Sequence, residues 1–250
     1  MLKKFAVSNF KCFNQRTVFD LSDPANYAFH QQVIEEGVKT KGIIYGANGS
    51  GKSNLALAIF DIILHLTDKE KLLAKYAPYL SLDSKNPMAE FEYEFCFDGT
   101  EVIYRYGKTD SLTLVYESLL INDEEVLNYN FENRKGFVSL AGAESLALSS
   151  DLPSETDKLS RVKYVKNNAI LQEDDATKAF IAFTTFVDNM LMFYSLDQRG
   201  YQGLSVGPDS FTQGIIREGK IAEFQQFLKE QGISYDLVSV EINGLSELYC

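Results

Sequence analysis

The sequence predicts an α/β fold in which a strand, a glycine-rich loop and a helix are followed by antiparallel strands and a set of later helices. Three observations support this prediction. The glycine-rich segment Gly46–Ser53 separates a short apolar run from a longer one rich in Ala and Leu. Aromatic residues alternate with mostly Glu over Glu90–Phe97, which is the period of a half-buried strand. A third apolar segment, Thr177–Leu196, has the length and composition of a packed helix.

Composition limits the class of protein. The 250 residues, of which 45% are hydrophobic and 24% charged, are enough for one large globular domain or two small ones. No apolar run approaches the length of a membrane span, and the opening Met-Leu-Lys-Lys lacks the apolar core of a signal peptide. Cys12, Cys96 and Cys250 show no metal or redox spacing and are typical of reduced thiols. We therefore expect a cytoplasmic protein with no membrane segment.

The first four elements are predicted from short apolar segments. Phe5–Phe10 is expected to be the opening strand, and Arg16–Leu21 a second strand antiparallel to it. Lys41–Tyr45 has the apolar character of a strand directly before the glycine-rich segment. Asn54–Leu64, directly after that segment, is rich in Ala and Leu and predicts a helix.

The glycine-rich segment fits the pattern of a phosphate-binding loop, the P-loop, at every fixed position. Its sequence, Gly46-Ala-Asn-Gly-Ser-Gly-Lys-Ser53, matches G-x-x-x-x-G-K-[ST]. A strand before the loop and a helix after it are the context that this motif requires. We therefore expect the chain to bind a nucleoside triphosphate. The contacting residues would be Gly46, Ala47, Asn48, Gly49, Ser50, Gly51, Lys52, Ser53 and Asn54.

Each residue type in the loop has a physical role. Gly46, Gly49 and Gly51 permit positive φ and let the backbone approach the phosphates. Successive N–H groups and the helix N-terminus present donors to those anionic groups. Lys52 supplies positive charge for the β- and γ-phosphates and is the expected catalytic residue, while the Ser53 hydroxyl is the expected Mg²⁺ ligand. A glycine-rich turn that only capped a core helix would have no need of this Lys-Ser pair.

Antiparallel strands are predicted next. A polar helix is expected at Lys69–Tyr76, ended by the following proline. The alternating strand Glu90–Phe97 leads through the turn signal Asp98-Gly99 into a returning strand at Val102–Tyr106. Leu112–Ile121 predicts a third strand.

The remaining residues predict irregular chain and then helices. Asn128–Asn168 is polar and is expected to be irregular or mobile. The long apolar helix Thr177–Leu196 follows, with an aromatic stripe that indicates core or interface. Arg217–Gln231 predicts an amphipathic helix ended by Gly232, and Tyr235–Ile242 a closing strand.

These elements suggest a division into three segments. Residues 1–66 would hold the N-terminal strands with the P-loop strand and helix. Residues 67–127 would form an antiparallel β-subdomain. Residues 128–250 would form an irregular segment, a helical lobe and a closing strand.

The position of the P-loop narrows the class of nucleotide-binding protein. Small GTPases and nucleotide kinases usually open with the P-loop strand, whereas here two candidate strands precede it, and the chain has no Asn-Lys-x-Asp base-recognition motif. Val7–Phe13, followed by a strand and then Gly46–Asn54, resembles the opening of ABC-type ATPase heads of the SMC/RecF/OLD group. The likeness is to AAA-15-like bacterial ATPases of phage-defence and abortive-infection systems.

This resemblance implies a fold, cofactors and partners. It implies ATP and Mg²⁺ as cofactors, with Lys11, which follows Asn9-Phe10, near the phosphates or the ribose. The strands over Glu90–Ile121 resemble the antiparallel β-subdomain of such heads, and the later helices would form their helical lobe. Two heads would sandwich ATP, so the resemblance implies a homo-oligomer with head-to-head contacts and a possible effector protein as partner.

The chain departs from the family's pattern where hydrolysis is concerned. Catalysis in such heads needs a Walker B carboxylate pair after an apolar run, and a signature loop. The best Walker B candidate, Leu119–Glu124, is predicted to be a hairpin turn because Asn122 interrupts the apolar run. Ser139–Glu144 echoes a signature loop in the wrong order along the chain, and Gln172 is a weak candidate for the γ-phosphate-sensing residue. We expect an N-terminal portion whose C-terminal half is missing, which binds ATP but hydrolyses it poorly alone.

Two other functions stay open. The chain could be a non-catalytic module in which ATP stabilises a partner interface, or a RecF-like DNA-repair ATPase. The net charge of −11 argues against a broad nucleic-acid surface. The basic stretch of Lys158, Arg161, Lys163 and Lys166 could form a local groove or a solvated face.

Overall fold

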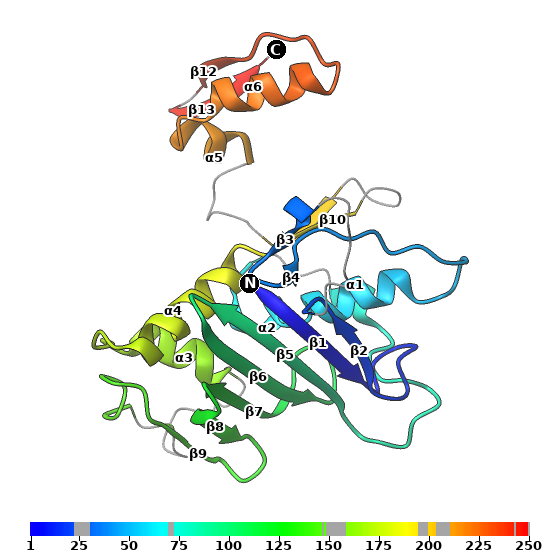
Figure 1. Cartoon of the computed structure of the whole chain (residues 1–250), viewed down its shortest axis with the longest axis vertical. Helices are drawn as coiled ribbons and strands as arrows, with labels where there is room; N and C mark the ends of the chain where they lie inside the picture. The colour runs from blue at the N-terminus through cyan, green and yellow to red at the C-terminus, as the bar shows by residue number, and fades with distance from the viewer. Residues whose placement is uncertain are drawn as a thin grey trace.

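The chain forms a mixed α/β structure around one large sheet (Figure 1). The computed structural model describes residues 1–22, 31–69, 73–146, 148, 159–194, 200–203, 211–242 and 244–249. None of the helices in these ranges has both the length and the apolar composition that a bilayer crossing requires.

A seven-stranded antiparallel sheet organises the structure, with the order β2-β1-β5-β6-β7-β8-β9. One sheet therefore draws strands from all three of the predicted segments. Its strands are β1 Leu2–Ser8, β2 Thr17–Asp20, β5 Ala89–Phe97, β6 Thr100–Lys108, β7 Leu114–Ile121, β8 Glu124–Asn130 and β9 Lys135–Val138. A separate short ladder joins β3 Ile34–Glu35 to β4 Val38–Lys39.

The strongest sequence patterns are confirmed in the sheet. The first two strands pair antiparallel, as expected. β5 and β6 form the predicted hairpin, with Phe97 opposite Thr100. The turn residues Asp98 and Gly99 have φ of +50° and +82°, the left-handed conformation that a two-residue hairpin turn needs.

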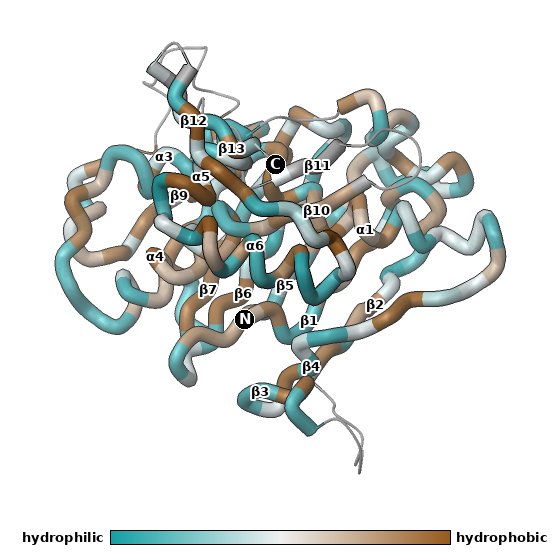
Figure 2. The backbone as a smooth tube through the Cα atoms, turned by 90° about the horizontal axis from the view of Figure 1, so that it is seen from above, coloured by the Kyte–Doolittle hydropathy of each residue, from teal (hydrophilic) through white to brown (hydrophobic). Residues whose placement is uncertain are grey.

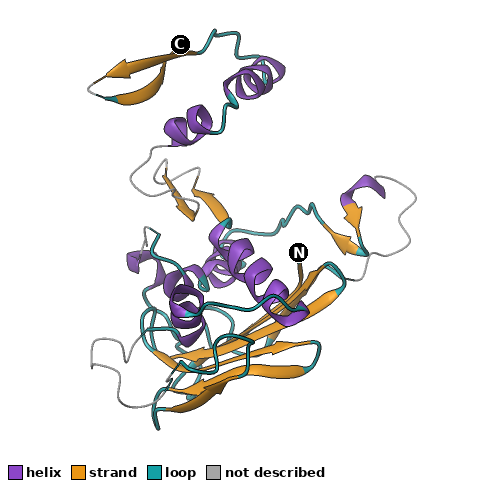
Figure 3. Cartoon of the chain, turned by 90° about the vertical axis from the view of Figure 1, so that its left-hand side faces the viewer, coloured by secondary structure: helices purple, strands orange, loops and turns teal. Residues whose placement is uncertain are grey.

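One face of the sheet is aromatic and is covered by helices. Phe91, Tyr93 and Phe95 on β5 are at most 2% exposed, and the residues between them are less buried, so the strand alternates as predicted. Figure 2 shows hydrophilic and hydrophobic residues mixed along the backbone of the strands. The helices lie on the aromatic side (Figure 3). They are α1 Lys52–Phe60, α2 Ile63–Leu66, α3 Arg161–Asn168 and α4 Asp175–Asp188.

The opposite face of the sheet is polar. Glu92 on β5 accepts from Arg16 and from Arg105, each at 2.7 Å. Glu94 on the same strand pairs with Lys4 on β1 at 3.0 Å. These partly exposed pairs add little stability individually, but they keep the polar side chains of neighbouring strands in register.

The helix after the P-loop is shorter than predicted because it breaks at Asp61. The expected helix ran through Asn54–Leu64, whereas α1 ends at Phe60 and α2 begins at Ile63. The Asp61 side chain is fully buried at this break and faces the sheet. An acidic residue inside an apolar Ala/Leu segment is the signal of this break.

Asp61 is the centre of a buried polar cluster that we call the polar clasp: Asp61, Tyr79, Tyr93, Tyr106 and Lys108. The Asp61 carboxylate accepts from the Lys108 ammonium at 2.8 Å and from the hydroxyls of Tyr79 and Tyr106 at 2.9 and 3.0 Å. The Tyr93 hydroxyl donates to the Ala58 and Ile59 carbonyls at 3.0 and 3.2 Å, at the C-terminal end of α1. The clasp therefore fastens this end of α1 to β5 and β6.

Burial shifts both charged groups of the clasp toward neutrality. It raises the pKa of the Asp61 carboxyl and lowers the pKa of the Lys108 ammonium. Each charge opposes the shift of the other, and the tyrosine hydroxyls add further hydrogen bonds to the carboxylate. The buried charges of Asp61 and Lys108 are tolerated inside the protein only because each has the other as its partner.

The segment Asn128–Asn168, expected to be irregular, contains regular structure. It includes the end of β8, then β9 and α3. The Asn130 and Asn133 side chains accept from backbone N–H groups in the turn between the two strands, so the asparagines mark a hairpin. Ser160 begins α3 by accepting from the Lys163 N–H.

The apolar helix predicted over Thr177–Leu196 is α4, which starts earlier and ends at Asp188. Asp174 and Thr177 form a reciprocal capping box that fixes its start. Phe180 and Phe183 are at most 1% exposed, which confirms the interpretation of the aromatic stripe as core. The chain then forms strand β10 Leu191–Tyr194, paired with β11 Gly200–Gly203. The helix expected over Lys69–Tyr76 is a 3₁₀ turn at Leu73–Tyr76, and residues 70–72 lie outside the description.

The C-terminal residues form a separate small unit, drawn in orange and red in Figure 1. It consists of α5 Phe211–Arg217, α6 Ile221–Glu230 and the hairpin of β12 Val238–Ile242 with β13 Leu245–Tyr249. The helix predicted over Arg217–Gln231 is confirmed as α6, and Gly232, with φ of +80°, follows its end.

Breaking the clasp from one side should be costly. Lys108→Met leaves the Asp61 carboxylate buried without its cation, so we expect a loss of about 3–5 kcal/mol of unfolding free energy. Urea denaturation measures this loss. The double variant Asp61→Asn/Lys108→Met should be more stable than Lys108→Met alone, because it contains no uncompensated charge. A Lys108→Met chain as stable as the wild type would contradict the described ion pair.

Candidate nucleotide-binding site

The glycine-rich loop is an exposed turn that leads directly into α1. Every residue from Thr40 to Ser50 is exposed, and the helix begins at Lys52 with Gly51 as its N-cap. Within the loop, the Ser50 N–H donates to the Ala47 carbonyl at 3.2 Å. The loop and the start of a helix thus adjoin as the motif predicts.

Two of the three motif glycines need the left-handed conformation. Gly49 has φ of +81° and Gly51 has φ of +92°. A Cβ on Gly51 would also lie 2.8 Å from the Cys12 Sγ. Gly46 differs from the expectation, since its φ is not in the left-handed region, and a Cβ there would lie 3.0 Å from the Ser50 Oγ. Gly46 is therefore explained by close approach within the loop.

Lys52 folds back over the loop. Its ammonium donates to the Gly46 carbonyl at 2.7 Å and to the Ala47 carbonyl at 2.8 Å, and it lies 3.5 Å from the Ser50 Oγ. Both carbonyls belong to the first half of the motif. The contacts hold the positive charge at the loop.

The start of α1 presents backbone donors. The first N–H groups of a helix have no acceptor within the helix. The N-cap residue here, Gly51, has no side chain to accept from them, and Ser53 in the first turn is exposed. These donors, the Lys52 ammonium and the Ser53 hydroxyl suit a polyphosphate with its Mg²⁺ ion.

The turn after β1 lies against the loop, but through a different residue than expected. The Lys11 ammonium contacts the carbonyls of Pro78 at 3.2 Å and Ala77 at 3.5 Å, and no contact of this group with the P-loop is seen among the described residues. Cys12 is the residue at the loop, because its Sγ accepts from the Asn54 amide at 3.2 Å. No sequence pattern pointed to this contact.

The segment before the loop is not a strand. Lys41–Tyr45 was expected to pair in a sheet, yet it is extended chain with no strand partner in the described part of the protein. Ile43 and Tyr45 are each 91% exposed. The apolar pattern is present, but the seven-stranded sheet ends at β2 and β9 and offers this segment no neighbour.

The candidate hydrolysis residues lie in turns. Asn122 and Asp123 have φ of +48° and +64° and join β7 to β8, which confirms a hairpin at the Walker B candidate. In the signature-like segment, the Gly142 N–H donates to the Glu144 carboxylate at 2.9 Å within a turn. Gln172 is exposed just before α4, and its backbone N–H donates to the Ala141 carbonyl. Within the described residues, no carboxylate is bonded to the P-loop, Lys52 or Ser53.

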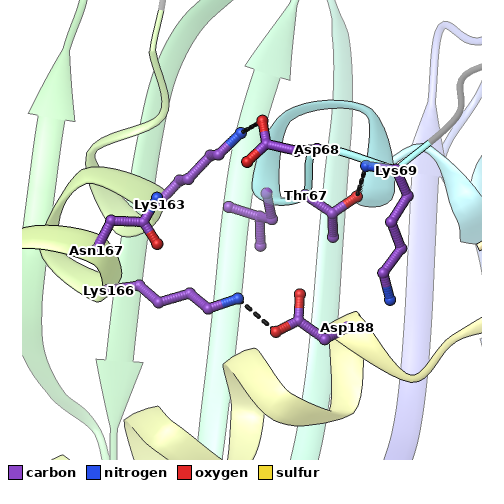
Figure 4. Close-up of a pocket in the computed structure, with 8 residues that line it drawn as sticks. Thr67, Asp68, Lys69, Lys163, Lys166, Asn167 and Asp188 are labelled. Carbon is purple, nitrogen blue, oxygen red and sulfur yellow. Dashed lines mark hydrogen bonds and ion pairs between the residues drawn. The ribbon is translucent and has the colours of Figure 1, made fainter. Parts of the chain in front are cut away.

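A second polar site lies just past the C-terminal end of α2, beside residues of α3 and α4 (Figure 4). Its cavity measures about 410 Å³. Lys163 pairs with Asp68, and Lys166 with Asp188. Burial lowers the pKa of Lys69; nearby Asp188 opposes that shift and Lys166 adds to it. The C-terminal ends of helices carry partial negative charge. Together with the carboxylates of Asp68 and Asp188, these ends balance the positive charge of the three lysines. We therefore assign no ligand to this cavity.

Most residues of the predicted basic stretch are engaged in ion pairs or ring contacts within the protein. Arg161 is 1% exposed and stacks on Tyr129, with its guanidinium 4.2 Å from the ring centre. Lys163 and Lys166 are in the two ion pairs just described, and Lys158 lies outside the described residues. Arg161 and Lys163 are buried and so do not form a solvated face, whereas Lys163 and Lys166 line the cavity just described.

Comparison with known families gives a match, and the P-loop lies within it. A family described as "AAA domain, putative AbiEii toxin, Type IV TA system" matches residues 43–197, which is more than half of the chain. The match begins just before the P-loop and runs through the sheet to α4 and β10. No curated protein matches the chain.

The packing of Cys12 on Gly51 is testable. Gly49→Ala and Gly51→Ala should each cost about 1–2 kcal/mol, because alanine is strained at left-handed φ. Gly51→Ala should lower the free energy of unfolding more than Gly49→Ala does, because its methyl group must also displace the Cys12 Sγ. Adding Cys12→Ala to Gly51→Ala should restore that difference. Urea denaturation of the four chains measures the effect. Equal losses for both glycine variants would contradict the described contact.

Proposed function

The chain belongs to this AAA-domain family, an ABC-like group of P-loop ATPases, and on that premise we propose that it is the ATP-binding part of a nucleotide-driven switch. The switch would control an effector in a toxin–antitoxin or abortive-infection system. The toxin–antitoxin association of the family supports the biological setting, and the P-loop supports the ligand.

The observation that carries the proposal is the geometry from Gly46 to Ser53. Two left-handed glycines bend the backbone, the Lys52 ammonium lies over loop carbonyls, and the helix start lacks a side-chain cap. A turn that only capped a helix would explain the glycines but not the placement of Lys52. The same features favour a polyanion at this point of the chain.

The residues of this chain would bind ATP and Mg²⁺ in distinct ways. Loop and helix N–H groups would hold the phosphates, Lys52 would bind the β- and γ-phosphates, and Ser53 would be the Mg²⁺ ligand. Lys52 must leave the Gly46 and Ala47 carbonyls to do this, and the released carbonyls face solvent. ATP with Mg²⁺ supplies the phosphoryl group and the free energy of its transfer. Lys11 near the phosphates or ribose stays a proposal from the family resemblance.

The chain is proposed to need completion for hydrolysis. No carboxylate meets the P-loop among the described residues, and the apolar segment Ile43–Tyr45 lies exposed beside it. We propose that a neighbouring strand pairs with this segment in the complete site and that a second head contributes the groups for catalysis. The missing carboxylate equally favours a binding-only module, in which ATP stabilises a partner interface.

Removing the P-loop charge should abolish nucleotide binding. Lys52→Ala loses the cation that faces the β- and γ-phosphates, so we expect no measurable ATP·Mg²⁺ binding by isothermal titration calorimetry. Lys41→Ala removes an exposed lysine just before the loop and is the matched control, with affinity near that of the wild type. ATP affinity that survives in Lys52→Ala would refute the assignment of the site.

Turnover separates the switch from the binding-only module. The 250-residue chain should bind ATP and release phosphate only slowly, because none of its described residues presents a general base at the loop. A rise in phosphate release on mixing with a candidate partner would support the switch. Rapid hydrolysis by the chain alone would show that the required carboxylate is already present.

A further inference from the structure

The P-loop helix is held chiefly at the end that is remote from the loop. Of its nine residues, only Leu57 and Ala58 are buried, and both lie in its second half. In its first half, Leu55 is only partly buried against the core, and Cys12, which is itself exposed, contacts Gly51 and Asn54. The preceding loop is exposed throughout. The direction of α1 therefore depends on its C-terminal half.

That C-terminal half is fixed by the polar clasp. The Tyr93 hydroxyl donates to the carbonyls of Ala58 and Ile59 in the last turn of the helix, in addition to the bond that the Ala58 carbonyl accepts from the Asp61 N–H. One residue past the helix, the Asp61 carboxylate is bound by Tyr79, Tyr106 and Lys108. Tyr93 and Tyr106 are themselves 3.2 Å apart through their hydroxyls. Directional hydrogen bonds thus set both the position and the tilt of this end.

We propose that the polar clasp positions the phosphate-binding start of α1, so that losing a single clasp hydroxyl weakens ATP binding although no clasp residue touches the nucleotide. This inference rests on the proposed function, because it assumes that the P-loop binds ATP. It makes Tyr93 and Tyr106 positioning residues of the site.

Helix geometry makes the effect large enough to measure. A nine-residue helix is roughly 13 Å long, so a tilt of about 5° at its anchored end moves its start by about 1 Å. Donors that bind phosphate must be placed to a fraction of this distance. Misplacement of about 1 Å can cost a site up to about a hundredfold in effectiveness.

The chain offers a matched control for a loss of stability alone. Glu117 is a second buried carboxylate in the same sheet, and it accepts from the hydroxyls of Tyr104 and Ser160 at 2.8 Å each. Burial raises its pKa, as it does for Asp61. The Ser160 contact lies on α3 and has no bond to α1. Ser160→Ala therefore removes a comparable buried hydroxyl without loosening the P-loop helix.

The experiment compares Tyr93→Phe, Tyr106→Phe and Ser160→Ala with the wild type, well below the unfolding temperature of each chain. Isothermal titration with ATP·Mg²⁺ should give a Kd raised about five- to tenfold in both tyrosine variants. Ser160→Ala should bind as the wild type does, even if it unfolds as easily as the tyrosine variants. Unchanged Kd values in both tyrosine variants, or an equal rise in Ser160→Ala, would overturn the proposal.

A second measurement does not depend on nucleotide. Amide hydrogen exchange at Leu55–Leu57, which includes the first hydrogen-bonded amide of α1, should be faster in Tyr106→Phe than in the wild type or in Ser160→Ala. Equal exchange in all three chains would overturn the clasp's positioning role. If the wild type bound no ATP, the proposed function would fail, and this exchange comparison alone would decide whether the clasp holds the start of the helix.

Discussion

The buried ion pair between Asp61 and Lys108 is the interaction on which the arrangement of this protein depends. It lies at the junction between α1 and α2 and joins this junction to β6 through side chains that are 0% exposed. The surrounding tyrosine hydroxyls satisfy the remaining lone pairs of the carboxylate. Such a pair adds little net stability compared with an apolar core, but it permits only one geometry, because any other leaves a charge without a partner.

The sequence was most informative where one residue pattern determined one structure. The alternation in Glu90–Phe97 and the turn at Asp98-Gly99 predicted the central hairpin, because the period of a strand and the left-handed turn are local properties. The P-loop motif likewise predicted Lys52 and the helix start. What could not be predicted depends on distant partners. The clasp joins Asp61 to residues 18 to 47 positions away in the sequence, and no residue pattern near Asp61 identifies Lys108 as its partner.

The wrong predictions have the same cause. Polar residues in Asn128–Asn168 were interpreted as loop, whereas the asparagines form the turn between β8 and β9 and Ser160 caps α3. In the basic stretch, Lys163 and Lys166 pair with the carboxylates of Asp68 and Asp188, and Arg161 stacks on an aromatic ring. Ile43–Tyr45 shows the reverse case, since its pattern is that of a strand and no described strand pairs with it. In each case the structure of the segment depends on whether the fold places a residue distant in the sequence against it.

The central claim is that the exposed loop from Gly46 to Ser53, anchored through α1, is where this protein meets a nucleotide. Hydrogen exchange of the whole chain, with and without ATP·Mg²⁺, tests it most directly. The account predicts new protection at residues 46–55, extending along α1 toward the clasp, and unchanged exchange around the lysine cavity of Lys69, Lys163 and Lys166. Protection centred on that cavity, or an unchanged pattern at the loop in saturating nucleotide, would contradict it.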